Sequence, residues 1–247
     1  KWLAMLLAPG SSLGGARPKA SVTDSKGNLW IAKFPAHDDT SNTAAWEYAT
    51  MQMARDAGLN TPQARLERLS KFGSTFLVKR FDRNGARRIH FASAMTLLGK
   101  SDGADTQSGS SYLDLAEFIM QYGARPKEDL QELWTRIVFS IAVSNTDDHL
   151  RNHGFLLTDS GWTLSPVYDV NPNPQGFGLS LNITDADNSL DFTLAMEIAP
   201  MFRLKTSEAG DIASRVRSVV SNWRTYASHA GISPTEQNQM QNAFRLE

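Results

Sequence analysis

The feature that most constrains the fold of this chain is a change in the pattern of its apolar residues near residue 85. Before that point, short apolar runs between turn residues predict strands, with one helix from Asn42 or Thr43 to about Ala57. The predicted strands cover residues 21–23, 29–34, 64–69 and 74–81. Beyond it, apolar residues recur every three or four positions and predict helices over 113–122, 130–143, 190–198, 209–229 and 234–244, with one hairpin at 154–167. We therefore expect an α+β protein of two lobes, a small β-rich lobe at residues 1–85 and a larger, mostly helical lobe at residues 86–247.

Composition limits the classes of protein that the chain can belong to. Of its 247 residues 41% are hydrophobic and 21% charged, enough for one large domain or two lobes around a cleft. A net charge of −1 gives no electrostatic support for nucleic acid as the main ligand. The absence of cysteine excludes disulfides, cysteine-bound zinc and thiol nucleophiles. Since no apolar run approaches the roughly 18 residues that span a bilayer, we expect a soluble, cytoplasmic protein. It begins at Lys1 rather than Met, so we also expect an N-terminal truncation.

The densest polar cluster, residues 145–153, directly follows an apolar helix. Asp147 and Asn152 have the Asp-x-x-x-x-Asn spacing of a kinase catalytic loop, in which the Asp handles the acceptor proton and the Asn holds Mg²⁺. If the turn of the following hairpin centres on Ser160, Asn152 lies opposite Tyr168 and Asp169 comes beside it. Asn and Asp oxygens suit Mg²⁺. The sequence thus predicts Asp147 as the catalytic base and Asn152 with Asp169 as the metal ligands.

The small lobe contains three further elements of a phosphotransfer site. The loop at residues 10–16 is rich in Gly and Ser, and its glycines would let backbone amides approach phosphates closely. Lys33 ends the strand Trp-Ile-Ala-Lys, which is similar to the kinase strand whose lysine pairs with phosphates and a helix glutamate, and Glu47 is the candidate partner. Each element alone could be a turn or a surface pair. Their order along the chain favours a protein-kinase-like fold.

Several segments resemble the HipA family of serine/threonine kinases. They are Gly-Ser-Ser-Leu-Gly-Gly-Ala-Arg-Pro-Lys at 10–19, Phe-Leu-Val-Lys-Arg-Phe-Asp at 76–82, Asn-Thr-Asp-Asp-His-Leu-Arg-Asn at 145–152 and Ser-Pro-Val-Tyr-Asp-Val at 165–170. The resemblance covers essentially the whole chain and implies ATP and Mg²⁺ as cofactors. It implies that Lys33 and His149 lie at the ATP phosphates and that Glu47 orients Lys33. The remaining ATP-binding positions that it implies are Gly14, Gly15 and Ala16 in the loop, Lys79, Arg80 and Phe81 at the adenine, and Arg151.

The resemblance also implies regulation and partners. Ser12 or Ser11 would be an autophosphorylation site, and a phosphate there would keep the loop from closing over ATP. Members of the family are toxins that phosphorylate aminoacyl-tRNA synthetases and are neutralised by a DNA-binding HipB-like antitoxin. We therefore expect a protein substrate of that kind, a HipB-like partner, and DNA contact only through that partner.

Two residues depart from the family pattern. Asp148 stands where a small residue usually follows the catalytic Asp, and the sequence does not explain it. Arg151 replaces a Lys, which keeps the charge but not the geometry of a phosphate contact. We expect the N-terminal subdomain of full-length HipA proteins to be missing or very short in this chain, so the architecture of a DNA complex does not follow from the resemblance.

Other interpretations stay open from the sequence alone. Phosphotransfer residues do not encode the acceptor, so the substrate could be a lipid or a small molecule. The chain could be an inactive HipA-like binding module. Asp147, His149 and His153 could bind a metal in a metalloenzyme, although no Glu stands where a metalloprotease needs its base. Finally, Asp147 and Asp148 could simply end a helix, with Asn152 and Asp169 in turns.

Overall fold

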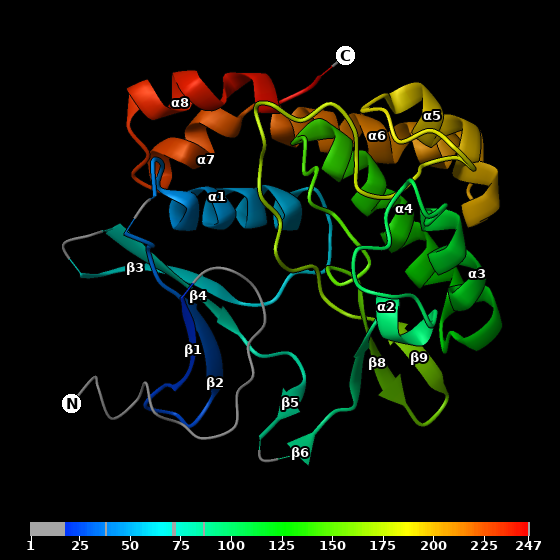
Figure 1. The fold of residues 1–247 in the computed structure, drawn as a ribbon, viewed down its shortest axis with the longest axis horizontal. Helices are drawn as coiled ribbons and strands as arrows, with labels where there is room; N and C mark the ends of the chain where they lie inside the picture. The colour runs from blue at the N-terminus through cyan, green and yellow to red at the C-terminus, as the bar shows by residue number, and fades with distance from the viewer. Residues whose placement is uncertain (1–17, 38, 71–72, 86, 247) are drawn as a thin grey trace.

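A mixed sheet-and-helix architecture is seen in a computed structural model, which describes residues 18–37, 39–70, 73–85 and 87–246. Its first sheet has four antiparallel strands in the order β1-β2-β4-β3. Their bounds are Lys19–Thr23 for β1, Leu29–Lys33 for β2, Ala64–Ser70 for β3 and Gly73–Lys79 for β4. Helix α1 (Thr43–Asp56) lies along this sheet (Figure 1). The strands and the helix that the sequence predicts in this part of the chain are therefore present.

The rest of the described chain is mostly helical (Figure 1). Its α-helices are α2 (Ala94–Leu97), α3 (Tyr112–Tyr122), α4 (Pro126–Ala142), α5 (Phe192–Ile198), α6 (Thr206–Val220), α7 (Trp223–His229) and α8 (Pro234–Met240), with the 3-10 helices η1 (Ala199–Phe202) and η2 (Gln241–Ala243). A short hairpin of β5 (Arg83–Asn84) and β6 (Arg87–Arg88) follows the first sheet. A second sheet has the order β7-β8-β9, with bounds Phe91–Ser93, Gly154–Thr158 and Gly161–Leu164.

Local chemistry sets the ends of α1. The Asn42 side chain accepts a hydrogen bond from the amide of Ala45 at 3.3 Å, which makes Asn42 the N-cap. At the other end Gly58 has φ of 95°, a left-handed conformation that stops a helix at low cost when the residue is Gly. Both signals were readable in the sequence, so the helix predicted there is confirmed.

The structure departs from two of the expected elements. The helix expected over 209–229 is broken between α6 and α7, where the side chains of Ser221 and Asn222 both donate to the carbonyl of Ser218 and compete with the helical hydrogen bonds. The hairpin register is also shifted by one position, because Thr158 faces Gly161 across the turn. Strand β9 ends at Leu164 rather than at residue 167: the amide of Ser165 still donates to the carbonyl of Gly154 at 2.8 Å, but Pro166 has no N–H to continue the ladder.

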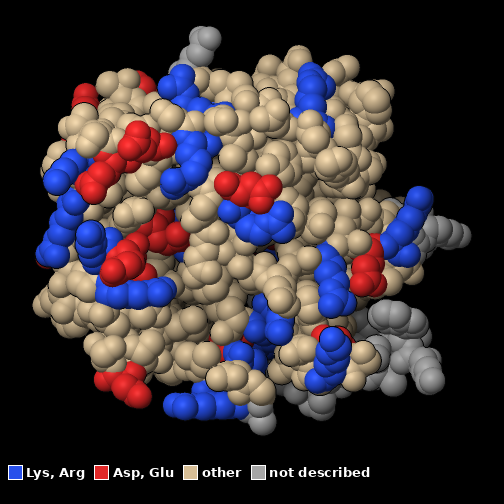
Figure 2. Space-filling model, turned by 180° about the vertical axis from the view of Figure 1, so that it is seen from behind, with Lys and Arg blue, Asp and Glu red and all other residues tan. Residues whose placement is uncertain are grey.

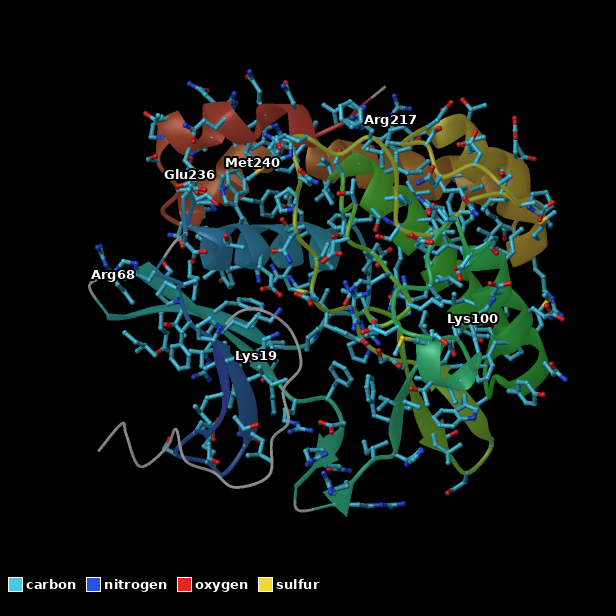
Figure 3. All side chains as sticks on the ribbon, in the orientation of Figure 1. Lys19, Arg68, Lys100, Arg217, Glu236 and Met240 are labelled. Atoms are coloured by element: carbon cyan, nitrogen blue, oxygen red, sulfur yellow. The ribbon has the colours of Figure 1, made fainter. Side chains whose placement is uncertain are left out.

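The C-terminal helices hold α1 in place. Trp46 of α1 packs on Trp223 and Phe244, with ring centroids 6.2 and 6.0 Å away, and the latter two rings stack at 4.3 Å. Glu236 of α8 lies at the start of α1 (Figure 3), where it accepts from Trp46 Nε1 at 2.9 Å and from the amide of Asn42 at 2.7 Å. A helix that belongs to the first lobe by sequence is thus attached to the last 25 or so residues of the chain through buried aromatic contacts.

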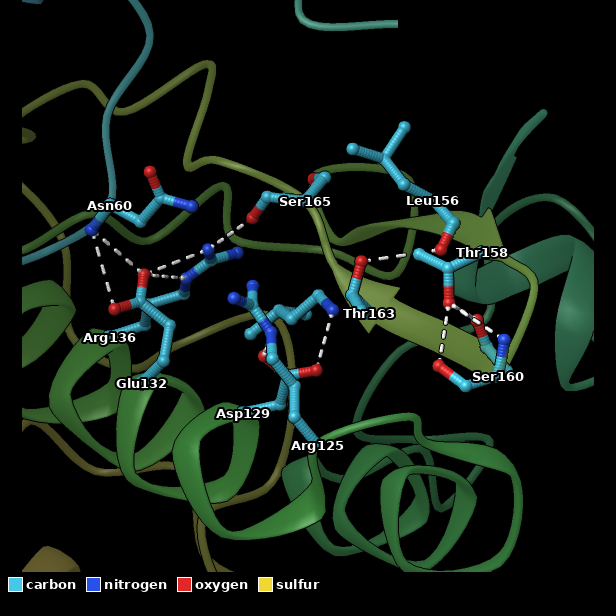
Figure 4. A network of polar contacts seen from close by, with 12 residues as sticks. Asn60, Arg125, Asp129, Glu132, Arg136, Leu156, Thr158, Ser160, Thr163 and Ser165 are labelled. Atoms are coloured by element: carbon cyan, nitrogen blue, oxygen red, sulfur yellow. Dashed lines mark hydrogen bonds and ion pairs between the residues drawn. The ribbon is translucent and has the colours of Figure 1, made fainter. Parts of the chain in front are cut away.

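Helix α4 runs through the core and positions the β8–β9 hairpin (Figure 4). The Asp129 carboxylate accepts from the amide of Leu164 at 2.9 Å, and the buried Arg136 guanidinium donates to the carbonyl of Ser165 at 2.5 Å. Glu132 pairs with Arg136 at 2.9 Å and also accepts from the amide of Asn60, in the segment between α1 and β3. These contacts fix where the chain emerges from β9.

We predict that Trp223→Ala destabilises the protein by about 3–5 kcal/mol, because it leaves a cavity between Trp46 and Phe244. Urea unfolding followed by circular dichroism measures the change. Met201→Ala, which truncates a large apolar residue that is 54% exposed, is the control and should change the free energy of unfolding by no more than about 0.5 kcal/mol. Equal losses in the two variants would contradict the role of this aromatic cluster.

Candidate active site

One lysine, whose side chain is only 13% exposed, joins three parts of the chain. Lys33 Nζ, at the end of β2, lies 2.6 Å from Glu47 Oε1 on α1 and 2.7 Å from Asp169 Oδ1, in the segment after β9. The structure thus brings together three of the residues that the sequence singled out. Each comes from a different element, so the cluster depends on how the sheet, α1 and the hairpin are arranged.

The charges in this cluster depend on one another. Burial alone would lower the pKa of Lys33, but the attraction of the two carboxylates outweighs it and raises that pKa, so Lys33 stays protonated. Burial raises the pKa of Glu47, and Lys33 offsets only part of this effect because Asp169 repels the Glu47 carboxylate. Burial also works against the charged form of Asp169, yet Lys33 outweighs it and lowers the pKa of that carboxyl.

Lys19 is a second cation that acts on this cluster. It faces Lys33 across the β1–β2 pair, and its charge favours the ionised forms of Glu47 and Asp169. For Glu47 this effect is smaller than that of burial, so the pKa of Glu47 stays raised. Figure 3 places Lys19 at the start of β1. We had singled it out only as the last residue of the motif at 10–19. The strand register that the two hairpin runs predict would have placed it beside Lys33.

The segment after α4 presents Asp147 to solvent. The side chain of Asp147 is 86% exposed, and its Oδ1 lies 3.9 Å from His149 Nε2. Asn152 is buried, and its Nδ2 donates to the carbonyl of Asp147 at 2.8 Å, which leaves its Oδ1 as the oxygen for another ligand. His149 in its charged form is the weakest of the influences that lower the pKa of Asp169, after Lys33 and Lys19, so this segment lies close enough to the Lys33 cluster to act on it.

Asp148, which the sequence did not explain, has the opposite environment to Asp147. It is only 5% exposed, and its Oδ2 accepts from Tyr112 Oη at 2.7 Å and from Ser140 Oγ at 3.2 Å. Its Oδ1 lies 3.0 Å from His153 Nε2. Burial alone would raise the pKa of Asp148, but His153 outweighs it, with help from the Tyr112 hydroxyl, and lowers that pKa. Asp148 therefore anchors the segment to α3 and α4 and pairs with His153 directly before β8.

Asp169 reaches the cluster through an unusual backbone conformation. Its φ of 58° lies in the left-handed region, which costs free energy for a residue with a side chain and persists only where its surroundings impose it. On one side Tyr168 Oη donates to the carbonyl of Arg151 at 2.7 Å. On the other, the amide of Asn171 donates to Asn145 Oδ1 at 3.1 Å. The segment at 145–152 thus holds Asp169 from both sides, although the expected hairpin register was one residue out.

The segment after β4 contains an aromatic cluster. The amides of Lys79 and Arg80 donate to the carbonyls of Gln63 and Leu29, so they belong to the sheet. The ring of Phe81 lies 5.8 Å from both Phe91 and Tyr168, measured between centroids. The sequence analysis did not bring these three rings together because they come from distant elements.

The remaining expected residues lie elsewhere. Arg151 Nη1 is 2.6 Å from Asp102 Oδ1 in an exposed ion pair, so in this structure it points to the loop before α3. Gly14, Gly15 and Ala16, together with Ser11 and Ser12, fall outside the described residues. His153, considered for a metal site, faces Asp148. Within the described ranges no group of three or more His, Asp or Glu side chains is arranged to hold a metal ion.

Two further properties concern the surface and the helices. On the face seen in Figure 2, basic and acidic side chains are interspersed, so that face presents no large region of one sign. Among the helices of the described ranges, none has both the length and the apolar composition needed to cross a bilayer.

The fold is that of protein kinases, and the strand with Lys33, the helix with Glu47 and the segment with Asp147 and Asn152 follow one another along the chain. Solved structures with the same fold include HipA of Shewanella oneidensis, in a complex with HipB and operator DNA (TM-score 0.72, 18% identity, 96% of this chain and 63% of that one). They also include the proinflammatory kinase CtkA of Helicobacter pylori (TM-score 0.61, 16% identity, 95% of this chain and 93% of that one).

The chain belongs to the HipA-like C-terminal domain family, which matches residues 11–223. A "Putative kinase" of Haemophilus influenzae is 29% identical over 195 residues, which are 70% of this chain and 56% of that protein. The serine/threonine-protein kinase toxin HipA of Shewanella oneidensis is 23% identical over 188 residues, 66% of this chain and 43% of that protein. The chain thus spans about half the length of these two relatives.

We predict that substitutions of two neighbouring aspartates differ greatly in their effect on the free energy of unfolding. Asp148→Ala should cost about 3 kcal/mol, because it leaves Tyr112 and His153 buried without their partner. Asp147→Ala, its matched control, should change stability by no more than about 0.5 kcal/mol because that side chain is exposed. Urea unfolding at pH 7 measures both.

The Asp148 effect should also depend on pH. Because folding lowers the pKa of Asp148, its contribution is present above the ordinary value of 3.8 and is lost as the pH falls through the folded value. The gap in stability between wild type and Asp148→Asn should therefore narrow as the pH falls below about 4. A gap that stays constant down to the lowest pH at which the protein folds would contradict a buried, charged Asp148.

Proposed function

We propose that this chain is an ATP- and Mg²⁺-dependent serine/threonine protein kinase with Asp147 as its catalytic base. The observation that carries the proposal is the buried Lys33 ammonium shared between Glu47 and Asp169. Protein kinases use such a lysine, held by a helix glutamate, at the nucleotide phosphates. Membership of a family with kinase relatives supports the same reaction.

Each residue has a defined task in the proposed reaction. An ammonium has three N–H donors, and Lys33 uses two on its carboxylate partners, which leaves one for a phosphate oxygen. Asp147 accepts the proton of a Ser or Thr hydroxyl as that oxygen forms a bond to the γ-phosphorus. The bond from the γ-phosphorus to the β-phosphate oxygen breaks, ADP leaves, and the proton stays on Asp147.

The residues present suit Mg²⁺. Asn152 Oδ1 and the Asp169 carboxylate would hold the ion, since Asn152 uses its Nδ2 on the loop and the pKa of Asp169 is lowered. A bound Mg²⁺ would offset the negative charge of the phosphates. Asp169 would then exchange part of its contact with Lys33 for the metal.

We assign the remaining nucleotide contacts as follows. The amides of Lys79 and Arg80 are occupied in the sheet, so the backbone of Phe81 is the best candidate in that segment for an adenine hydrogen bond. Its ring, with Phe91 and Tyr168, supplies apolar surface there. Gly14, Gly15 and Ala16 would cover the phosphates, and His149, beside Asp147, would lie near them. Arg151 could take part only after it leaves Asp102.

We further propose a protein substrate, of which an aminoacyl-tRNA synthetase is one candidate, and autophosphorylation at Ser11 or Ser12. A HipB-like antitoxin is the proposed partner, because a protein with the same fold is found with HipB and operator DNA. DNA contact would then be indirect, and the place of action would be the cytoplasm. A kinase of a lipid or small molecule, or an inactive binding module, are the alternatives.

We predict that Asp147→Ala reduces transfer of labelled phosphate from ATP by about 10²–10⁴-fold, the usual contribution of a general base. Purified protein is incubated with Mg²⁺ and γ-³²P-ATP, and label on protein, including Ser11 and Ser12, is located by mass spectrometry. Asp169→Ala should also lose activity, whereas Asp185→Ala, at an exposed aspartate, should keep it.

Transfer that survives in Asp147→Ala would contradict the assigned base. Wild-type ATP turnover with no labelled protein would favour a small-molecule kinase, and no turnover would favour a binding module.

A further inference from the structure

Phe177 is the most exposed of the large apolar side chains in the described ranges. It is 93% exposed, whereas the next, Met201, is 54% exposed. It lies in the segment between Asp169 and α5, residues 170–191. Single exposed apolar residues are common on protein surfaces, so its exposure alone carries no inference. What distinguishes Phe177 is the structure beneath it.

The backbone on both sides of Phe177 is tightly packed. A Cβ atom on Gly176 would lie 2.2 Å from Thr146 Cγ2, and one on Gly178 would lie 2.7 Å from Asn188 Nδ2. Only glycine allows so close an approach at these two positions. The chain on either side of the ring is thus pressed against its neighbours while the ring itself projects into solvent.

Side-chain hydrogen bonds hold the same segment. Asn173 Nδ2 donates to Thr146 Oγ1 at 2.8 Å, and Ser180 Oγ donates to the carbonyl of Thr146 at 2.7 Å. Arg245 Nη2 donates to the carbonyl of Gly176 at 3.2 Å. The segment is therefore attached before, at and after Phe177, and two of the attachments are to one residue.

That residue, Thr146, directly precedes Asp147 in the chain. The backbone that carries the exposed Asp147 carboxylate and the backbone that carries the exposed Phe177 ring are therefore both held at Thr146. A hydroxyl that reaches Asp147 brings the molecule that carries it to the surface around Phe177. A ring on a backbone that is already ordered costs less conformational freedom on contact than one on a mobile loop, and aromatic rings are frequent anchors of interfaces.

We propose that Phe177 is a docking residue that selects polypeptide substrates with apolar side chains near the acceptor Ser or Thr. The inference rests on the proposed kinase function and adds the chemistry of the substrate. A projecting ring suits a polypeptide surface, whereas small molecules bind in concave sites. Residues 170–191 contain three aspartates and no Lys or Arg, which disfavours an anionic membrane as the partner of Phe177.

The test compares phosphorylation of substrates with ATP turnover in the absence of substrate. Cells express wild type, Phe177→Ser, Phe177→Leu, Met201→Ser or Asp147→Ala, and phosphosites that require Asp147 are quantified by mass spectrometry. We expect Phe177→Ser to lower occupancy of these sites at least tenfold, Phe177→Leu to recover part of the loss, and Met201→Ser to match wild type. For a substrate identified in this way, Phe177→Ser should raise KM and leave kcat unchanged. ATP turnover without substrate and the melting temperature should stay at wild-type values.

Three results would overturn the inference. Equal site occupancy in wild type and Phe177→Ser would show that the ring does not select substrates. A parallel loss of ATP turnover would place its effect in the fold or the nucleotide site. Loss of binding by Phe177→Ser to vesicles of phosphatidylcholine and phosphatidylglycerol, with phosphosites unchanged, would assign the ring to membranes. By contrast, ATP turnover in wild type with no Asp147-dependent phosphosite would reject the protein-kinase function itself, and the docking role with it.

Discussion

The ion pairs of Lys33 are the interaction on which the arrangement of this protein depends. A buried ammonium is costly unless carboxylates compensate it, and here the two carboxylates come from α1 and from the segment after β9. If either element moved by a few ångströms, the remaining partners would be left with an uncompensated charge. The same three groups that stabilise the contact between the sheet, α1 and the hairpin are the ones that we assign to nucleotide binding, so their geometry is established before any ligand binds.

Each carboxylate is held by a different part of the larger, helical region. The position of Glu47 depends on α1. Trp223 and Phe244 pack against Trp46 on the side of this helix, and Glu236 binds at its start. Asp169 depends on the exit from β9, which α4 fixes through Asp129 and Arg136. The C-terminal helices therefore contribute to the site without touching it. In a kinase whose glutamate helix could swing freely, the lysine pair would form only on activation; here packing against α7 and α8 keeps the pair formed.

Whether a feature could be predicted from the sequence depends on how close together in the chain the residues that determine it lie. The N-cap at Asn42 and the glycine after α1 are local, so the helix and the position of Glu47 could be predicted. The spacing of Asp147 and Asn152 is also local. Asp148 could not be understood, because two of its partners, Tyr112 in α3 and Ser140 in α4, come from helices that only the folded chain brings to it. The one-residue shift of the hairpin arises at the turn, where Thr158 pairs with Gly161, and the run of turn residues at 158–161 does not specify which two of them face one another.

The two adjacent aspartates show how the fold separates support from chemistry. A loop that must present a carboxylate to solvent at a fixed position needs an anchor near that carboxylate, and a buried charged residue with three polar neighbours provides a rigid one. Asp148 anchors the loop from below, while Thr146 on the other side of Asp147 anchors the segment that carries Phe177. A reactive group and a recognition group can both be fully exposed and still hold a constant separation only if the residues between them are packed. The buried polar residues around Asp147 provide this packing. Asp148, which departs from the family's motif, therefore helps to hold Asp147 in the position in which the motif places it.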